Sequence, residues 1–331
     1  AVRSDDTDLC TRVKRQRNVL EHGAIWGIEP SQFVTGVNKF SSHDAYKLVA
    51  TPDCGAVLVW KLFGREFFPV TDTPQRGLLN MELLSQDYLY NMGFRWLHIL
   101  VGITWIGLLY YFNLVQVPGL AAYGDEGKAR NITIDKIARR ALWWFRWAAI
   151  ATLATGLLIT GQKEYWNNFL NGSAAGNGHD VAISVGMLLG ILMAANVWMI
   201  IWKNQKVVLA NVVNVLGGGE ANADAPTAGR KALLASRQNM IFSVSMLFFM
   251  VGSAHFYSGA FGDATSSNAR MFFTIALVIT ALLELNAIGI FGGIKAGNKM
   301  LWMYESHKNA LISSGVLWLV LWILSEVLLG K

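Results

Sequence analysis

The stretch "RWLHILVGITWIGLLYYFNLVQVP", residues 95–118, decides the fold class of this chain. It is long and apolar enough to cross a lipid bilayer, which takes about 20 residues in a helix. Backbone groups in lipid must be satisfied within the segment, and the alternating pattern of a barrel strand is missing. The sequence therefore predicts an all-α polytopic membrane bundle with six transmembrane helices, at roughly 94–117, 142–161, 181–202, 240–258, 271–292 and 310–329.

The composition agrees with a membrane location. Of the 331 residues, 53% are hydrophobic and only 15% are charged, against roughly 25% charged in an average soluble domain. The net charge of +6 does not indicate a nucleic-acid partner, because the basic residues are not gathered into one run or stripe. The two cysteines, Cys10 and Cys54, form neither a CxxC metal site nor a CxxCH haem-attachment motif. The expected surroundings are a lipid bilayer.

Basic residues are concentrated in three of the loops, and short cytoplasmic loops collect Lys and Arg. The three loops are predicted to face the cytoplasm because they contain Lys128, Arg130, Lys136, Arg139 and Arg140; Lys203, Lys206, Arg230, Lys231 and Arg237; and Lys295, Lys299 and Lys308. The opposite side has only Lys163, Arg270 and Lys331. Both ends of the membrane domain are therefore expected to be extracytoplasmic. The Gly-, Ala- and Asn-rich residues 212–229 are expected to form part of a flexible cytoplasmic linker that follows a short helical extension of the third span.

Residues 1–80 differ in character from residues 81–331, which form the predicted transmembrane helical domain. They contain both cysteines and none of the 11 methionines, and no apolar run in them is long enough to span a membrane. Met81 is the first methionine of the chain. Residues 1–80 are interpreted either as a small soluble extension or as sequence that is not native coding sequence.

One face of the first span is polar. At about 100° per residue, Arg95, Gly102, Asn113 and Gln116 all lie within roughly 60° of His98 around the helix. An ionisable group is costly toward lipid and tolerated toward a protein-lined or hydrated cavity. This face is therefore predicted to point into the bundle.

The fourth span ends in "GSAHFYSG", which places His255 at the same predicted depth as His98. Gly102 and Gly252 lie one turn deeper on their respective spans, where they could make room for a flat group. Two helix-borne histidines at equal depth can ligate the iron of a b-type haem. They can also form a proton relay or a site for an anionic substrate, because imidazole titrates near neutral pH.

Two further ionisable residues lie inside predicted spans. Glu284, in the fifth span, is the deepest acid of the chain, and a carboxyl in mid-membrane favours a role in a proton path or in substrate binding. Arg146, in the second span, is expected to extend toward the interface among Trp143, Trp144 and Trp147, where cation–π contacts are available.

The runs "NMGFRWLHILVGITWIGLLYYFNLVQVP" and "ARRALWWFRWAAIATLATGLLITG" resemble the membrane domain of the cytochrome-linked urate hydroxylases, the PuuD-type urate oxidases. The resemblance covers about residues 81–331. It implies a bacterial inner-membrane oxidoreductase that converts urate to 5-hydroxyisourate in purine breakdown. It also implies that electrons pass to a c-type cytochrome, either a fused C-terminal domain or a separate protein, since the chain itself has no CxxCH.

The hypothesis that follows assigns urate, or a related purine, to a site near the predicted outer surface. Arg95 would pair with the purine anion, while His98 or His255 would ligate haem b or transfer a proton. Two other functions stay open: a non-catalytic haem b anchor that passes electrons to a partner, and a proton-coupled small-solute transporter that uses Glu284 and His98 as relay groups.

Overall fold

The computed structural model describes residues 47–51, 55–59, 88–161, 178–257 and 266–330. The chain divides into two compact units, Ala1–Gly77 and Leu78–Lys331. In the first unit, strand β1 (Lys47–Thr51) pairs with strand β2 (Gly55–Val59) in an antiparallel hairpin in which Val49 lies opposite Val57. The interpretations of residues 1–80 given above stay predictions.

The second unit confirms the predicted fold class. Its described residues contain six helical segments that are long and apolar enough to cross a membrane: Phe94–Ala121, Gly127–Thr160, Gly178–Leu216, Ala225–Tyr257, Ser267–Ala287 and His307–Leu329. Large apolar side chains such as Ile103, Met199 and Val327 are 66%, 71% and 73% exposed, because they cover the outside of the bundle where lipid would lie. The protein is therefore a multi-pass membrane protein.

The spans are built from α-helices that contain short π-helical turns. The first two consist of α4 (Phe94–Tyr110), η3 (Tyr111–Gln116), α5 (Val117–Ala121), α6 (Gly127–Thr133), η4 (Ile134–Ala138) and α7 (Arg139–Thr160), with η2 (Leu89–Gly93) preceding α4. The third and fourth consist of α9 (Gly178–Ala195), η5 (Asn196–Ile201), α10 (Trp202–Leu216), α11 (Ala225–Gly252) and η6 (Ser253–Tyr257). The last two are α12 (Ser266–Ala287) and α14 (His307–Leu329), joined through η7 (Lys299–Leu301) and α13 (Trp302–Glu305).

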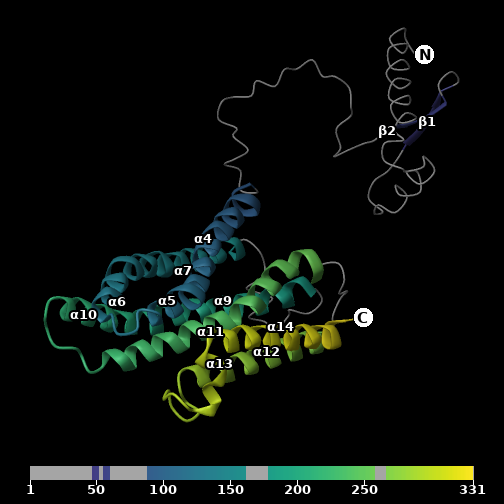
Figure 1. Cartoon of the computed structure of the whole chain (residues 1–331). Helices are drawn as coiled ribbons and strands as arrows, with labels where there is room; N and C mark the ends of the chain where they lie inside the picture. Colours follow the sequence, from purple (N-terminus) through teal and green to yellow (C-terminus); the bar gives the residue numbers. More distant parts are fainter. Residues whose placement is uncertain (1–46, 52–54, 60–87, 162–177, 258–265, 331) are drawn as a thin grey trace, which may run out of the picture. The chain divides into compact units, whose positions relative to one another are not determined.

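Helix α11 is the centre of the bundle. It packs against α9, α10 and α14, while α4 packs chiefly against α7 (Figure 1). Its inner side is unusually polar, since Arg237, Gln238 and Asn239 are consecutive and all are buried. Three buried polar residues in a row need partners on several neighbouring helices, because no single face of a helix holds all three.

The three basic connections gather at one end of the bundle, which we call the basic end. Arg139 at the start of α7 donates to the carbonyl of Leu209 on α10, with a distance of 3.5 Å. Arg230 near the start of α11 donates to the carbonyl of Ile294 at 3.0 Å and forms a bidentate ion pair with Glu305 on α13. These contacts join all three connections, as the positive-inside pattern requires if they share one side of the membrane.

The connection at residues 212–229 differs from the expected flexible linker. Helix α10 continues to Leu216 and α11 begins at Ala225, so only residues 217–224 lie outside the two helices. Gly219 and Asn222 form backbone or side-chain bonds with Asn214 and Asn211, which close the turn tightly. The 39-residue segment Gly178–Leu216 would be about 58 Å long as a helix, well beyond a hydrocarbon core of about 30 Å. The bundle therefore extends past the membrane at its basic end.

Candidate functional site

His98 lies against helix α7. Its Nδ1 is 3.1 Å from the Thr155 hydroxyl oxygen, which itself lies 2.7 Å from the carbonyl of Ala151. The Thr155 hydroxyl also lies 3.0 Å from the carbonyl of Thr152, so this hydroxyl links the imidazole to the backbone of α7. A side chain on Gly156 would place its Cβ only 3.2 Å from the ring, so glycine at this position makes room for the imidazole.

His98 and Gly102 line a cavity of about 550 Å³ between α4, α7, α9 and α11. The walls are almost entirely apolar, and the polar residues among them are His98, Trp105, Tyr110, Thr152 and Thr160. The predicted polar face of the first span does point inward here, since Asn113 is buried and His98 is half-buried. Arg95 is the exception, because it is exposed and does not line this cavity.

His255 occupies a different environment. It lies in η6, is exposed, and does not line the cavity that His98 lines. A Cβ on Gly252 would contact the Tyr257 ring at 3.5 Å, so the space predicted beside this glycine is filled by a tyrosine of the same segment. The described residues give the cavity one imidazole, and they do not fit a haem held by both histidines. Haem b ligation by the pair stays a prediction, and no chemical step is assigned to it.

Glu284 belongs to a buried polar network at the middle of the bundle. The Asn196 side-chain amide donates to the Glu284 carboxylate and to the Asn239 side-chain oxygen, both at 3.0 Å. The Asn239 amide in turn donates to the carbonyl of Met193 at 2.9 Å. The carboxylate thus joins α12 to Asn196 of η5, and through Asn196 to α11, and it also lines a small cleft of about 240 Å³ beside Thr280. Asn196 begins the π-helical turn η5, and such turns are frequent at functional sites.

The network continues toward the basic end through Tyr304. The phenol donates to the Gln238 side-chain oxygen at 2.6 Å, and Arg237 donates to the backbone carbonyl of Tyr304. Burial raises the pKa of the Tyr304 phenol, and the negative charge of Glu284 raises it further. Several buried atoms here have no partner among the described residues: Gln238 Nε2, Arg237 Nε and Asn286 Oδ1. Such atoms in a polar interior are typical positions for buried water.

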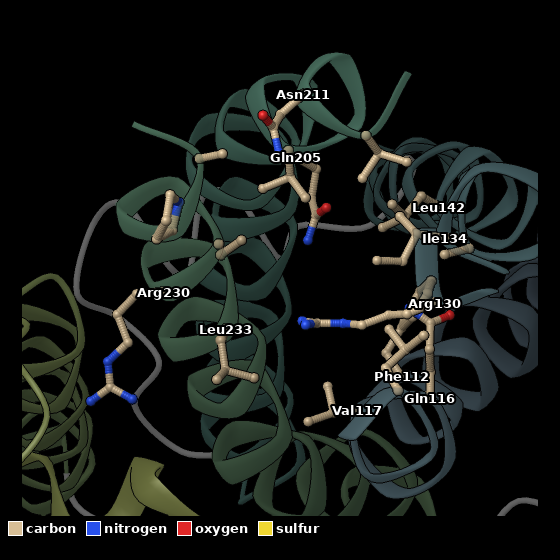
Figure 2. Close-up of a pocket in the computed structure, with 18 of the residues that line it drawn as sticks. Phe112, Gln116, Val117, Arg130, Ile134, Leu142, Gln205, Asn211, Arg230 and Leu233 are labelled. Atoms are coloured by element: carbon tan, nitrogen blue, oxygen red, sulfur yellow. The ribbon is translucent and has the colours of Figure 1, made fainter. Parts of the chain in front are cut away.

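A second, larger cavity of about 810 Å³ lies at the basic end, between η3, α6, η4, α7, α10 and α11. Figure 2 shows the Arg130 guanidinium reaching into its centre, with Gln205 pointing toward the same space. Arg230 also lines the cavity, but its guanidinium is turned away toward Glu305. No carboxylate is found among the lining residues of the described structure.

Comparison with known proteins gives one similarity, to a family of urate oxidases. The fold defines a helical multi-pass membrane protein, and residues 173–319 match the family model described as Urate oxidase N-terminal. The match covers less than half of the chain, so it shows a similarity to that family over this segment. Searches of curated proteins and of solved structures gave no match.

The family match covers the segment that holds Glu284, His255 and the whole polar network, from Asn196 to Tyr304. It leaves out Arg95 and His98. Glu284 could be identified from the sequence, but its hydrogen bond with Asn196 could not, because an asparagine in a span is equally compatible with simple helix–helix contact. Arg130 was predicted only as a charge in a loop, since nothing in the local pattern showed that α6 folds back over a cavity.

Proposed function

We propose that the protein is a membrane-bound oxidoreductase that hydroxylates urate to 5-hydroxyisourate and passes the electrons to a c-type cytochrome. The observation that carries the proposal is the coincidence of two findings. The segment that matches the urate oxidase family contains a half-buried carboxylate, Glu284, that accepts a hydrogen bond from the Asn196 amide, which itself also donates to Asn239 of α11. A carboxyl at such depth is costly and is kept for chemistry more often than for packing.

The reaction balances with water as the oxygen source. Urate and one water molecule give 5-hydroxyisourate, two protons and two electrons, and the electrons reduce two molecules of oxidised cytochrome c. A group that accepts a proton as the water oxygen bonds to the purine carbon lowers the barrier, with an effect of roughly 10²- to 10⁴-fold on the rate. Glu284 is the proposed acceptor of that proton, which would reach it through the buried polar network, and Asn196 holds its carboxylate in place through the 3.0 Å hydrogen bond.

The unpartnered polar atoms around Tyr304 support the route by which the protons leave. Buried water at Gln238 Nε2 and Asn286 Oδ1 would join the centre of the bundle to the basic end. Asn239 lies only one helical turn from Ser236, which lines the basic-end cavity. The network and the cavity are therefore close along α11.

The test uses membranes that contain the full chain, with added oxidised cytochrome c and urate. We expect urate-dependent cytochrome reduction with two cytochromes reduced per urate consumed. Glu284→Gln keeps the acceptor oxygen for Asn196 and removes the base, so the rate should fall by roughly 10²-fold or more. The matched control is Glu326→Gln, a carboxylate near the end of α14 that accepts from Trp322 at 3.0 Å on the exposed surface.

Three outcomes would count against the proposal. If the wild-type chain consumes no urate and reduces no cytochrome, the oxidoreductase function is wrong. If urate accumulates in sealed vesicles without oxidation, the protein is a transporter. If Glu284→Gln and Glu326→Gln both keep the wild-type rate, Glu284 is not the proton acceptor.

A further inference from the structure

We infer that the basic-end cavity is a binding site for a planar, multiply oxygenated anion of the oxidised-purine class. The choice of a purine rests on the proposed function, whereas the choice of an anion rests on the cavity alone.

Arg130 supplies a positive charge that the protein itself does not neutralise. Its guanidinium extends into the cavity (Figure 2), and it has no ion-pair or side-chain hydrogen-bond partner among the residues that the structure describes. The other lining arginine, Arg230, is already paired with Glu305 at 2.5 Å. A guanidinium presents five donors in a planar fork, which suits a planar anion better than a point charge would.

Five side-chain amides line the same cavity: Gln116 on η3, Asn131 on α6, Gln205 and Asn211 on α10, and Asn222 in the turn before α11. The Gln116 side-chain oxygen is buried and has no hydrogen-bond partner within the described structure. A side-chain amide offers both a donor and an acceptor. A set of amides can therefore form hydrogen bonds with the edge of a ligand on which carbonyl and N–H groups alternate. The edge of an oxidised purine has this alternation, whereas the phosphate of a lipid headgroup offers mainly acceptors.

The remaining walls are apolar and partly aromatic. Phe112 and Phe145 both line the cavity, and their rings meet edge to face with centroids 5.4 Å apart. Leu142, Ile201 and Leu233 complete the apolar surface. Ligand sites typically combine such walls with a few polar groups that fix orientation. Here the walls would cover the ring faces while Arg130 and the amides contact the edge.

The position of this cavity gives the substrate a different entrance from the one predicted around Arg95. The cavity lies at the basic end, which the charge pattern places on the cytoplasmic side, whereas Arg95 begins the first span at the opposite end. Arg95 remains exposed and lines no described cavity with volume for a purine. A purine anion would therefore enter from the side on which the basic loops gather.

The experiment measures equilibrium binding of radiolabelled urate to the full chain in nanodiscs of zwitterionic lipid. Wild type should bind urate saturably. Arg130→Gln should weaken binding by roughly tenfold or more, because a charge-assisted hydrogen bond is lost. Gln205→Leu should weaken it by a smaller factor. The matched control is Arg140→Gln, an exposed arginine in the first turn of α7 that does not line the cavity and should leave binding unchanged.

Each contrary result has a defined meaning. Equal urate affinity in wild type and Arg130→Gln, or no saturable binding in wild type, overturns the inference. Displacement of urate when anionic lipid is added to the nanodiscs assigns the cavity to a lipid headgroup and also overturns it.

The cytochrome assay separates this inference from the proposed function. If urate binding depends on Arg130 but no cytochrome is reduced, the inferred binding site is supported and the proposed oxidoreductase function is contradicted. If urate reduces cytochrome with the same KM in wild type and Arg130→Gln, the proposed oxidoreductase function is supported and the inferred binding site is contradicted.

Discussion

At the level of single residues, the buried hydrogen-bond network depends on the hydroxyl group of Tyr304. Its phenol donates to Gln238, whose side chain is fully buried and whose Nε2 already lacks a partner within the described structure. Tyr304→Phe would leave the Gln238 amide without any partner, and a buried polar group left in this state costs about 1–3 kcal/mol. We therefore expect the midpoint of thermal unfolding in detergent to fall by several degrees, at about 2–4 °C per kcal/mol.

Tyr123→Phe is the matched control for that measurement. The Tyr123 hydroxyl is 2.9 Å from the Thr133 hydroxyl near the basic end, where water can replace it, so the midpoint should barely change. Equal shifts for the two variants would mean that Gln238 finds another partner in the interior and that the network does not depend on the phenol.

The side chains of the first two spans show which features depend on helical periodicity and which depend on tertiary packing. The inward orientation of His98, Asn113 and Gly102 could be predicted, because helical periodicity alone decides which residues share a face. The partner of Arg146 could not. The nearby Trp143, Trp144 and Trp147 were expected to surround it, yet its guanidinium lies 3.7 Å from the ring of Trp202 on α10. Helical periodicity determines the direction in which a side chain points. The residue that the side chain contacts depends on the tertiary packing of the helices.

At the scale of elements, the end of α12 illustrates a boundary that a hydropathy pattern misplaces. Residues 271–292 were predicted to form one span, but α12 ends at Ala287 and Gly289 adopts φ +91°. A Cβ at Gly289 would lie 2.6 Å from Ile294 Cγ2 and 3.2 Å from the backbone of Gly293. The apolar character continues past Ala287, whereas the helical backbone stops because the turn requires this glycine.

Substitution of this glycine tests the role of the turn. Gly289→Ala should destabilise the protein by about 1–2 kcal/mol from the left-handed backbone alone, and by more if Ile294 cannot move. Gly315→Ala, in the middle of α14, meets no atom within 4 Å and should be neutral or slightly stabilising, since alanine favours a helix. The measurement is the fraction of monodisperse protein that survives heating. An unchanged Gly289→Ala protein would show that the turn relaxes without cost.

At the scale of the whole molecule, the distribution of charge sets the orientation in the membrane. The three basic connections are joined to one another at one end by Arg139, Arg230 and Glu305, so they must share one side of the bilayer. The number and order of spans could be predicted from the sequence, since about 20 apolar residues leave few alternatives to a spanning helix. The extension beyond the membrane and its cavity could not, because their helices are amphipathic segments whose partners lie far away in the sequence.

The orientation itself can be measured by cysteine labelling. In a background of Cys10→Ser and Cys54→Ser, Glu220→Cys introduces an exposed thiol in the turn between α10 and α11, and Arg270→Cys introduces one near the start of α12. A membrane-impermeant maleimide added to intact spheroplasts should label Arg270→Cys, and it should label Glu220→Cys only after lysis. The reverse pattern, or equal labelling of both, would contradict the charge rule for this chain. The expected pattern places the C-terminal end of α14 outside, on the side where a c-type cytochrome would accept electrons, while the Arg130 cavity opens toward the cytoplasm. A purine anion and the electron acceptor would then approach the bundle from opposite faces.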